Sequence, residues 1–245
     1  MSEVDRRYER QVLLPEIGVE GQIKLASSSV LVVGAGGLGA PVLQYLAAAG
    51  VGHIGIIDGD VVSESNLNRQ ILYSMQDIGK PKALLAAGRL ECLNAEIKIT
   101  AIPTMLTDEN AAKIINDYDM LALCTDSLEA RRVGNRACAA AGIPFVDGAV
   151  SGFHGTVMTI VPGETACYEC IQGFLVQPKG KIPILGAMAA WIGCAEALSV
   201  IRLLLGADDF SRGAVLFFDG KEMSVERVLV EKSPGCMCNR HSALN

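Results

Sequence analysis

Residues 30–39 read Val-Leu-Val-Val-Gly-Ala-Gly-Gly-Leu-Gly, an apolar run that leads into a glycine-rich turn. The pattern Gly-x-Gly-x-x-Gly between a strand and a helix is typical of nucleotide-binding folds, because the glycines let the backbone turn sharply and approach a ligand. Gly36 and Gly37 are therefore candidate binding residues, beside a helix N-terminus that favours phosphate. A second expected strand, 53–58, ends at Asp58, whose carboxylate can accept hydrogen bonds from a ribose. The turn alone does not separate NAD from ATP, and a turn needed only for packing is the alternative.

Strands and helices alternate along the first 150 residues. The pattern predicts strands at 29–33, 53–58, 96–102, 118–124 and 143–147, with helices at 38–49, 81–94, 107–116 and 128–141. This alternation predicts an α/β fold, a Rossmann-like and mostly parallel sheet with helices on both faces. Beyond residue 150, expected strands at 156–161, 214–219 and 224–230 predict an antiparallel extension. We expect one domain over 1–245, made of an N-terminal helical arm (1–28), a nucleotide-binding half (29–150) and a second half (151–245) that holds the metal, dimer and partner surfaces.

The composition limits the classes of protein to which the chain can belong. Half of its 245 residues are hydrophobic, and the formal net charge of −6 gives no general electrostatic reason to bind nucleic acid. Residues 1–10 lack the apolar core of a signal peptide. Residues 184–205 are apolar over roughly the ~20 residues that span a bilayer, but they include Glu196, Arg202 and several small residues, which favours a buried helix that partly faces a second subunit. We expect a cytoplasmic protein that binds neither membrane nor nucleic acid.

The loop after Asp58 carries polar and basic side chains. Loops at the carboxyl ends of parallel strands line the ligand crevice, so Asn66 and Arg69 could contact ribose and phosphate there. Lys82 opens the next expected helix. Cations beside phosphate oxygens are what phosphoryl or nucleotidyl transfer requires, so Arg69 and Lys82 indicate chemistry on a nucleoside triphosphate. A solvated loop with surface basic residues is the alternative.

Asp126 follows another apolar strand, 118–124, and is expected near the same crevice. Its carboxylate could hold Mg²⁺ on the triphosphate, since Mg²⁺ prefers oxygen ligands. Asp126 or Ser127 could instead cap the helix that follows. The two interpretations are compatible if Ser127 is the cap.

Four of the eight cysteines form two close pairs, Cys167/Cys170 and Cys236/Cys238. Two such pairs can furnish a tetrahedral thiolate site for zinc, and such a closed site would be structural rather than catalytic. Because the second pair is Cys-x-Cys rather than the commoner Cys-x-x-Cys, His241 is a possible substitute for Cys238. Ordinary buried thiols or a disulfide are the alternatives.

Together these residues resemble the ThiF/MoeB/HesA family of ubiquitin-activating-enzyme-like adenylyltransferases, closest to its molybdopterin-synthase adenylyltransferase branch. The resemblance covers nearly the whole chain. It is carried by Arg7-Tyr8-x-Arg10-Gln11, the glycine turn at 34–39, Asp-x-Asp-x-Val-x-x-Ser-Asn-Leu-x-Arg-Gln at 58–70, Gly79-Lys80-Pro81-Lys82, Cys-Thr-Asp at 124–126, Cys-x-x-Cys at 167–170 and Pro234-Gly235-Cys236.

The resemblance implies a homodimer that uses ATP, Mg²⁺ and Zn²⁺ and adenylates the Gly-Gly tail of a small ubiquitin-like sulfur-carrier protein. By similarity, Asp58 holds the ribose, Arg69 and Lys82 hold the phosphates and Asp126 holds Mg²⁺. Arg10 matches an arginine that reaches the triphosphate from the partner subunit. The carboxylate that attacks the α-phosphorus is already ionised at neutral pH, so no general base is required.

The chain differs in two features from some members of that family. No cysteine lies between Ile171 and Leu185, where several members carry a reactive one, so we expect adenylation without a thioester on the enzyme. The chain also has no room for a rhodanese domain, so a separate donor would supply sulfur. Three alternatives remain open: a different carboxylate on a short peptide or a tRNA, an NAD-dependent oxidoreductase, and a non-catalytic binding protein.

Overall fold

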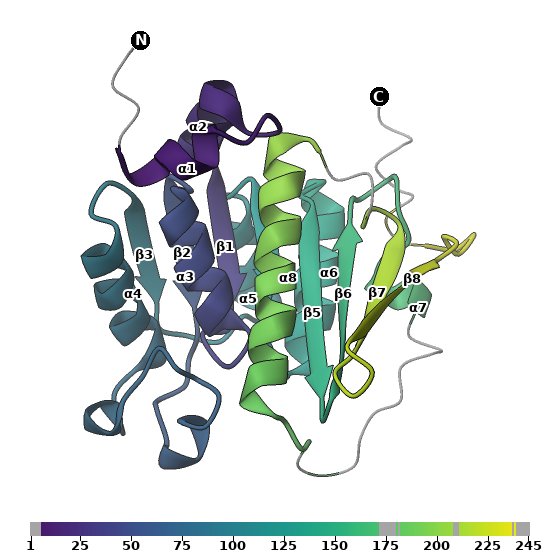
Figure 1. The fold of residues 1–245 in the computed structure, drawn as a ribbon. Helices are drawn as coiled ribbons and strands as arrows, with labels where there is room; N and C mark the ends of the chain where they lie inside the picture. The colour runs from purple at the N-terminus through teal and green to yellow at the C-terminus, as the bar shows by residue number, and fades with distance from the viewer. Residues whose placement is uncertain (1–5, 172–179, 181, 208–210, 237, 239–245) are drawn as a thin grey trace.

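The computed structural model describes residues 6–171, 180, 182–207, 211–236 and 238. Its centre is an eight-stranded sheet with the order β3-β2-β1-β4-β5-β6-β7-β8 (Figure 1). The strands are β1 (Ser29–Val33), β2 (His53–Ile57), β3 (Lys98–Ile102), β4 (Met120–Leu123), β5 (Phe145–Ser151), β6 (His154–Ile160), β7 (Ala214–Asp219) and β8 (Ser224–Leu229). The strands β1 to β5 pair in parallel and the last three pair antiparallel, which confirms the predicted mixed sheet.

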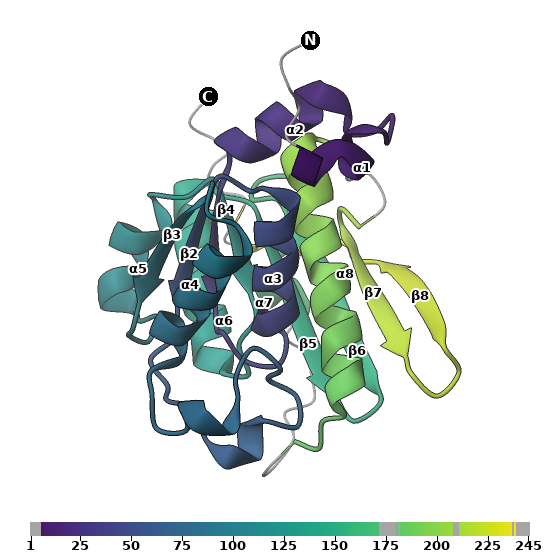
Figure 2. The same ribbon diagram turned by 60° about the vertical axis from the view of Figure 1, so that its left-hand side comes forward.

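Helices cover both faces of the parallel part, because its strands are apolar on both sides. The first face packs against α3 (Gly39–Ala49), α4 (Lys82–Leu93) and α8 (Gly186–Leu205), and the second against α5 (Asp108–Ile115) and α6 (Leu128–Ala141) (Figures 1 and 2). Neighbouring residues of β1 show the division: Val30 and Val32 are fully buried in the first layer, and Leu31 in the second.

The hairpin of β5 and β6 departs from the sequence prediction. The sequence predicts strands at 143–147 and 156–161, but the observed strands extend toward each other to Ser151 and His154. Only Gly152 and Phe153 separate these two paired residues. Gly152 has a φ of 60°, the left-handed conformation that such a tight turn favours. The extension carries β5 past the end of β4, so its last residues overhang the carboxyl edge of the parallel strands.

The N-terminal arm lies at the amino-terminal ends of the parallel strands, on the opposite side of the molecule from the glycine turn, which follows the carboxyl end of β1 (Figure 1). It consists of a 3₁₀ turn (Arg6–Tyr8), α1 (Glu9–Val12) and α2 (Gly18–Ser27). Asn94 donates a hydrogen bond of 2.8 Å to the Tyr8 hydroxyl, and Arg7 donates to the Leu93 carbonyl at 3.0 Å. These contacts fix the arm against the C-terminal end of α4.

The long helix α8 is apolar enough to span a membrane by length and composition, but half of its most apolar window is buried within the fold. It packs against β5, β6 and α3 (Figure 2). The expectation of a core helix is therefore confirmed. Leu198 is exposed on its outer face, and Tyr45 is exposed on the neighbouring α3.

Candidate functional site

The glycine turn between β1 and α3 is held in one conformation by close backbone contacts. Gly34 has a φ of 95°, which side-chain-bearing residues rarely adopt. A Cβ at Gly39 would overlap the carbonyl group of Gly34. The Tyr73 hydroxyl donates a hydrogen bond of 2.8 Å to the Ala35 carbonyl and braces the turn from outside. The backbone of the turn is thus preorganised at the start of α3, as the sequence predicts.

Asp58 lies directly after β2 and faces this turn. One carboxylate oxygen accepts a hydrogen bond from the Ala35 N–H and the other accepts one from the Asp60 N–H, both at 2.8 Å. Burial raises the pKa of Asp58, and the two backbone hydrogen bonds oppose that rise. Asp58 therefore links β2 to the glycine turn, and its remaining lone pairs face the cavity that it lines.

The polar loop contains two short 3₁₀ helices, Glu64–Asn66 and Met75–Asp77, where the sequence suggested irregular structure. The Asn66 side chain accepts a hydrogen bond from the Ser63 N–H and so caps the first of them. Asn66 does not line the cavity, whereas Arg69 does. The Arg69 guanidinium donates to the Ser65 carbonyl at 2.9 Å and to the Asn68 side chain at 3.0 Å.

Lys82 occupies the first turn of α4 and is almost fully buried. Its ammonium group pairs with the exposed Asp60 carboxylate at 3.0 Å. The neighbouring Gln70 is buried next to Gly36, and its Oε1 has no hydrogen-bond partner in the described part of the chain. Lys82 and Gln70 both line the cavity, so a ligand that enters it would find there a cation and an amide whose oxygen has no partner among the described residues.

Asp126 follows β4 and lines the same cavity, exposed and without a hydrogen bond to its carboxylate among the described residues. The helix cap is Ser127, whose hydroxyl accepts a hydrogen bond of 3.2 Å from the Ala130 N–H. The structure thus confirms Ser127 as the cap and leaves the Asp126 carboxylate available for another role. The free carboxylate offers oxygen ligands of the type that Mg²⁺ prefers.

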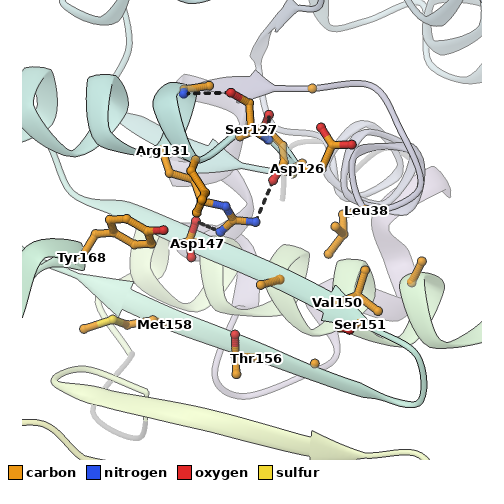
Figure 3. Close-up of a pocket in the computed structure, with 18 of the residues that line it drawn as sticks. Leu38, Asp126, Ser127, Arg131, Asp147, Val150, Ser151, Thr156, Met158 and Tyr168 are labelled. Atoms are coloured by element: carbon orange, nitrogen blue, oxygen red, sulfur yellow. Dashed lines mark hydrogen bonds and ion pairs between the residues drawn. The ribbon is translucent and has the colours of Figure 1, made fainter. Parts of the chain in front are cut away.

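These residues line one cavity of about 2150 Å³. It begins at Gly36, Gly37 and Asp58 and continues across the face of β5 to β8 that α8 leaves uncovered. Figure 3 shows Asp126 and Ser127 on one side of it and Val150, Thr156 and Met158 of the strands on the other. The outer part is lined by apolar side chains such as Phe217, which is 45% exposed. The cavity is therefore much larger than a mononucleotide needs.

Arg10 does not reach the cavity of its own chain. It lies exposed on α1, in the arm at the amino-terminal ends of the parallel strands (Figure 1). Within one chain, the structure therefore brings together Gly36, Gly37, Asp58, Arg69, Lys82 and Asp126, and leaves Arg10 and Asn66 outside.

The two cysteine pairs meet beside α7 (Tyr168–Ile171). The sulfur of Cys167 lies 3.5 Å from that of Cys236 and 3.9 Å from that of Cys170, and the Cys238 sulfur lies within 4.8 Å of the Cys167 and Cys236 sulfurs. Sulfurs around a tetrahedral zinc, with Zn–S of about 2.3 Å, lie about 3.8 Å apart. The thiols of Cys167, Cys236 and Cys238 thus lie close enough together to share one metal ion, and Cys170 contacts this group through Cys167. His241 lies outside the described residues.

A buried group of ionisable side chains lies at the floor of the cavity, which Arg131 and Asp147 help to line (Figure 3). Arg131 of α6 forms an ion pair with Asp147 of β5, and both are almost fully buried. Glu196 of α8 is completely buried; one carboxyl oxygen accepts a hydrogen bond of 3.3 Å from the Cys124 thiol, and the other has no partner within the described chain. Burial raises the pKa of Glu196 well above its ordinary value, which favours the protonated carboxyl.

The sequence prediction omitted several of these residues. Asp60 stands in the quoted motif, but nothing in the sequence shows that it pairs with Lys82. Arg131 comes four residues after the cap Ser127, one helical turn into α6, and that spacing could have placed it near the strand end. Glu196 was noted only as a charge in an apolar helix, the pattern of a buried group with a specific partner.

The model of the family described as the ThiF family matches residues 8–238. The chain is 41% identical over 241 residues to the sulfur carrier protein adenylyltransferase of Thermus thermophilus, covering 94% of this chain and 89% of the relative. It is 37% identical to the SAMP-activating enzyme E1 of Haloferax volcanii, covering 94% and 87%. It is 40% identical to the adenylyltransferase and sulfurtransferase MOCS3 of Mus musculus, of which it spans 52%. Among solved structures, E. coli MccB with ATP superposes with a TM-score of 0.84 at 25% identity, covering 95% of this chain and 74% of that one.

Proposed function

Because the chain belongs to the ThiF family and is an adenylyltransferase of the ubiquitin-activating type, we propose that it adenylates the C-terminal glycine carboxylate of a small ubiquitin-like sulfur-carrier protein. ATP is the second substrate, and the products are an acyl-adenylate and pyrophosphate. Formation of a thiocarboxylate on the carrier follows. The chain acts as one unit over its 245 residues, with the pathway set by the carrier that it accepts.

One observation carries this proposal: the nucleotide-binding turn and the open strand face share a single cavity. A mononucleotide fills only the end that contains Gly36 and Asp58. The remainder, over β5 to β8, offers the exposed side chains of Phe217 and Val228. A folded carrier can rest its body on that surface while its flexible tail reaches the α-phosphate, whereas a small metabolite would leave it uncovered.

The chemistry follows from charge. The tail carboxylate is ionised and weakly nucleophilic, so catalysis rests on positioning and on neutralising the phosphate oxygens. Arg69 and Lys82 supply the positive charge at the cavity, with Lys82 exchanging Asp60 for a phosphate when ATP binds. Asp58 receives the ribose hydroxyls. Neither hydride transfer nor a thioester is needed for these roles.

Asp126 is the residue that we assign to Mg²⁺. Its carboxylate faces the cavity without a protein hydrogen-bond partner in the described chain, as a metal ligand should. A bound Mg²⁺ would neutralise charge on the triphosphate as pyrophosphate leaves.

Zinc is the metal that we assign to Cys167, Cys170, Cys236 and Cys238. The short distances between the sulfurs support the assignment, and four thiolates leave no open position for a substrate. The site would tie the segment after β8 to α7 and so fix one end of the strand face.

We further propose a homodimer in which Arg10 of each subunit completes the cavity of the other. The position of Arg10 far from its own cavity supports this arrangement, as do the exposed apolar side chains Leu13, Ile23, Tyr45 and Leu198 on the arm, α3 and α8. An arginine supplied in this way stabilises transition-state charge, a contribution of about 10³-fold or more in other phosphoryl-transfer enzymes.

We place the reaction in the cytoplasm, with sulfur delivered by a separate donor protein. The cysteines with raised thiol pKa values support adenylation without a thioester: burial raises the pKa of Cys124, Cys138 and Cys194, so these thiols are poor nucleophiles. The net charge of −6 supports a protein substrate over a nucleic acid.

The test is ATP–pyrophosphate exchange with a panel of Gly-Gly-tailed carriers. Exchange should require a carrier and should fall about 10²-fold or more in Arg69→Ala and in Asp126→Ala, because each removes a charge that acts on the phosphates. Arg136→Ala is the matched control, since Arg136 lies on the outer face of α6 and pairs there with Asp108 and Glu129. Exchange that survives both site changes would refute the assignment.

The same assay separates a carrier from a short peptide substrate. A synthetic peptide that ends in the carrier's last residues should support exchange far less well than the intact carrier, because it cannot occupy the surface over β5 to β8. Equal activity with the free peptide would show that the folded body is not recognised.

A further inference from the structure

Arg131 is held by contacts on three sides in the buried group at the floor of the cavity. Its guanidinium donates to the Asp147 carboxylate, to the Thr125 carbonyl at 2.6 Å and to the Gly148 carbonyl at 2.7 Å. The side chain is 6% exposed. Figure 3 shows it reaching from α6 toward both the end of β4 and the start of the β5 overhang. Arg131 thus joins α6, the segment that follows β4 and the strand β5, at the point where the chain leaves the sheet toward Asp126.

The contact with Thr125 matters because Asp126 is the next residue. The Asp126 carboxylate makes no hydrogen bond of its own in the described chain, so its position depends on the backbone on either side. On the C-terminal side, the Ser127 hydroxyl accepts from the Ala130 N–H. On the N-terminal side, the fixed group is the Thr125 carbonyl, which Arg131 holds. A metal ligand that lacks its own support needs such a second layer of contacts to stay oriented.

Two other roles for Arg131 fit the geometry less well. A phosphate-binding role would need N–H groups that point into the cavity, but three of the five guanidinium N–H groups already donate to Asp147, Thr125 and Gly148. A role limited to pairing with Asp147 would not require the two backbone contacts. A lysine could neutralise that carboxylate, whereas only a planar guanidinium spans the carboxylate and both carbonyls.

We propose that Arg131 is a positioning residue that fixes the Thr125–Asp126 backbone and thereby sets the Asp126 carboxylate for the divalent cation of the nucleotide. The inference rests on the proposed function, because it takes Asp126 as the cation ligand. It assigns Arg131 no contact with ATP or with the carrier.

The experiment compares two variants that both remove the buried ion pair. Asp147→Asn keeps the guanidinium on Thr125, whereas the double change Arg131→Met with Asp147→Asn removes it without leaving a buried charge unpaired. ATP binding is measured by calorimetry as Mg²⁺ is titrated, alongside the thermal midpoint of each protein. The double variant should need about ten-fold more Mg²⁺ than Asp147→Asn for half-maximal effect, while both bind ATP equally without Mg²⁺. An equal Mg²⁺ requirement in the two variants overturns the proposal.

A third variant covers the case in which the double variant does not fold. Arg131→Lys keeps the positive charge beside Asp147 but cannot reach both carbonyls, so it should retain the fold and still raise the Mg²⁺ requirement. A wild-type requirement in Arg131→Lys overturns the proposal. Arg136→Lys, on the exposed face of the same helix, is the matched control.

The binding assay needs no carrier, so it separates this inference from the proposed function. Pyrophosphate exchange that fails with every carrier would count against the carrier proposal alone. An Asp126→Ala protein with an unchanged Mg²⁺ requirement would remove the ligand that Arg131 is inferred to position, and would overturn the inference.

Discussion

Replacing Glu196 by glutamine tests whether the completely buried carboxyl group is neutral. The groups around it come from each neighbouring element: the Cys124 thiol after β4, Asp147 and the Gly148 backbone on β5, and Arg131 on α6. Burial is the largest cause of the raised pKa of Glu196, and the Asp147 carboxylate adds to it. Arg131 opposes the rise, but its charge is already matched by Asp147. The folded protein therefore keeps a proton on Glu196 at pH values where the unfolded chain loses it.

The sign of the pH dependence follows from proton binding. Above the ordinary pKa of 4.5, the unfolded state gains free energy by ionising Glu196 and the folded state does not, so the stability of the natural protein falls as pH rises. The fall is about 1.4 kcal/mol per pH unit and ends at the folded-state pKa. Glutamine has no proton to lose. Between pH 5.5 and 7.5, the variant should therefore gain up to about 2.8 kcal/mol relative to the natural protein, the full amount if the folded-state pKa lies above this range.

The assay is thermal or urea unfolding of both proteins at several pH values between 5 and 8. For a chain of this size, about 2.8 kcal/mol corresponds to a relative shift in the midpoint of about 6–11 °C. A constant offset between the two curves would report the change in hydrogen bonding to Cys124. The predicted quantity is the difference in slope, to which all other titrating groups contribute equally in the two proteins.

Parallel stability curves would refute the reasoning, since they would show that Glu196 titrates alike in the folded and unfolded states. A natural protein that gains stability relative to the variant as pH rises would show the opposite arrangement, an ionised Glu196 paired with Arg131. Asp219→Asn is a control, because that carboxyl is exposed and its pKa is lowered by backbone hydrogen bonds.

Three further changes probe other parts of the molecule. Gly39→Ala should abolish ATP binding in calorimetry and lower the free energy of unfolding by several kcal/mol, because the added methyl group would overlap the turn backbone. Gly88→Ala is the control: this glycine lies on the exposed side of α4 with free space around it, so the change should raise the free energy of unfolding by about 0.5–1 kcal/mol. Metal analysis should find about one zinc per chain, and Cys167→Ser should lose it with a lower thermal midpoint but unchanged Mg²⁺–ATP binding; a stable metal-free natural protein would contradict this. Phe217→Asp should raise the KM for the carrier by about ten-fold without changing ATP affinity. Leu84→Asp, at a similarly exposed apolar position on α4, should change neither.

The nucleotide-binding half could be predicted from sequence because its signals are local. The apolar run 30–33, the glycine spacing and the acid at Asp58 all lie within one β-α-β unit, where periodicity and turn chemistry agree. The two cysteine pairs were also predictable, since their spacing carries the chemistry. The positions of Arg69, Lys82 and Asp126 at one edge followed from the parallel strand order.

The interactions among these residues could not be predicted. The pairing of Lys82 with Asp60, the cap made by Asn66 and the hold of Arg131 on Thr125 each depend on side-chain directions that a residue pattern does not specify. The β5 overhang was missed because the expected strand, 143–147, ended directly before Gly148. The structure gives a packing reason for that glycine: a Cβ there would overlap the Glu196 carboxyl. The residue marks a close tertiary contact, not a break in the sheet.

The placement of the N-terminal arm has a consequence for how variation in this protein should be interpreted. Arg10 and the cavity lie at opposite ends of the parallel strands. In the proposed dimer, each reaction centre therefore needs residues of both subunits, and its geometry depends on the angle at which the two copies meet. Tyr45 and Leu198 contact no reacting group and lie exposed on a single chain. In the pair they would set how far Arg10 reaches, so turnover would respond to substitutions that leave the fold of one copy untouched. Surface residues far from the nucleotide would then be under the same selection as the residues that touch it.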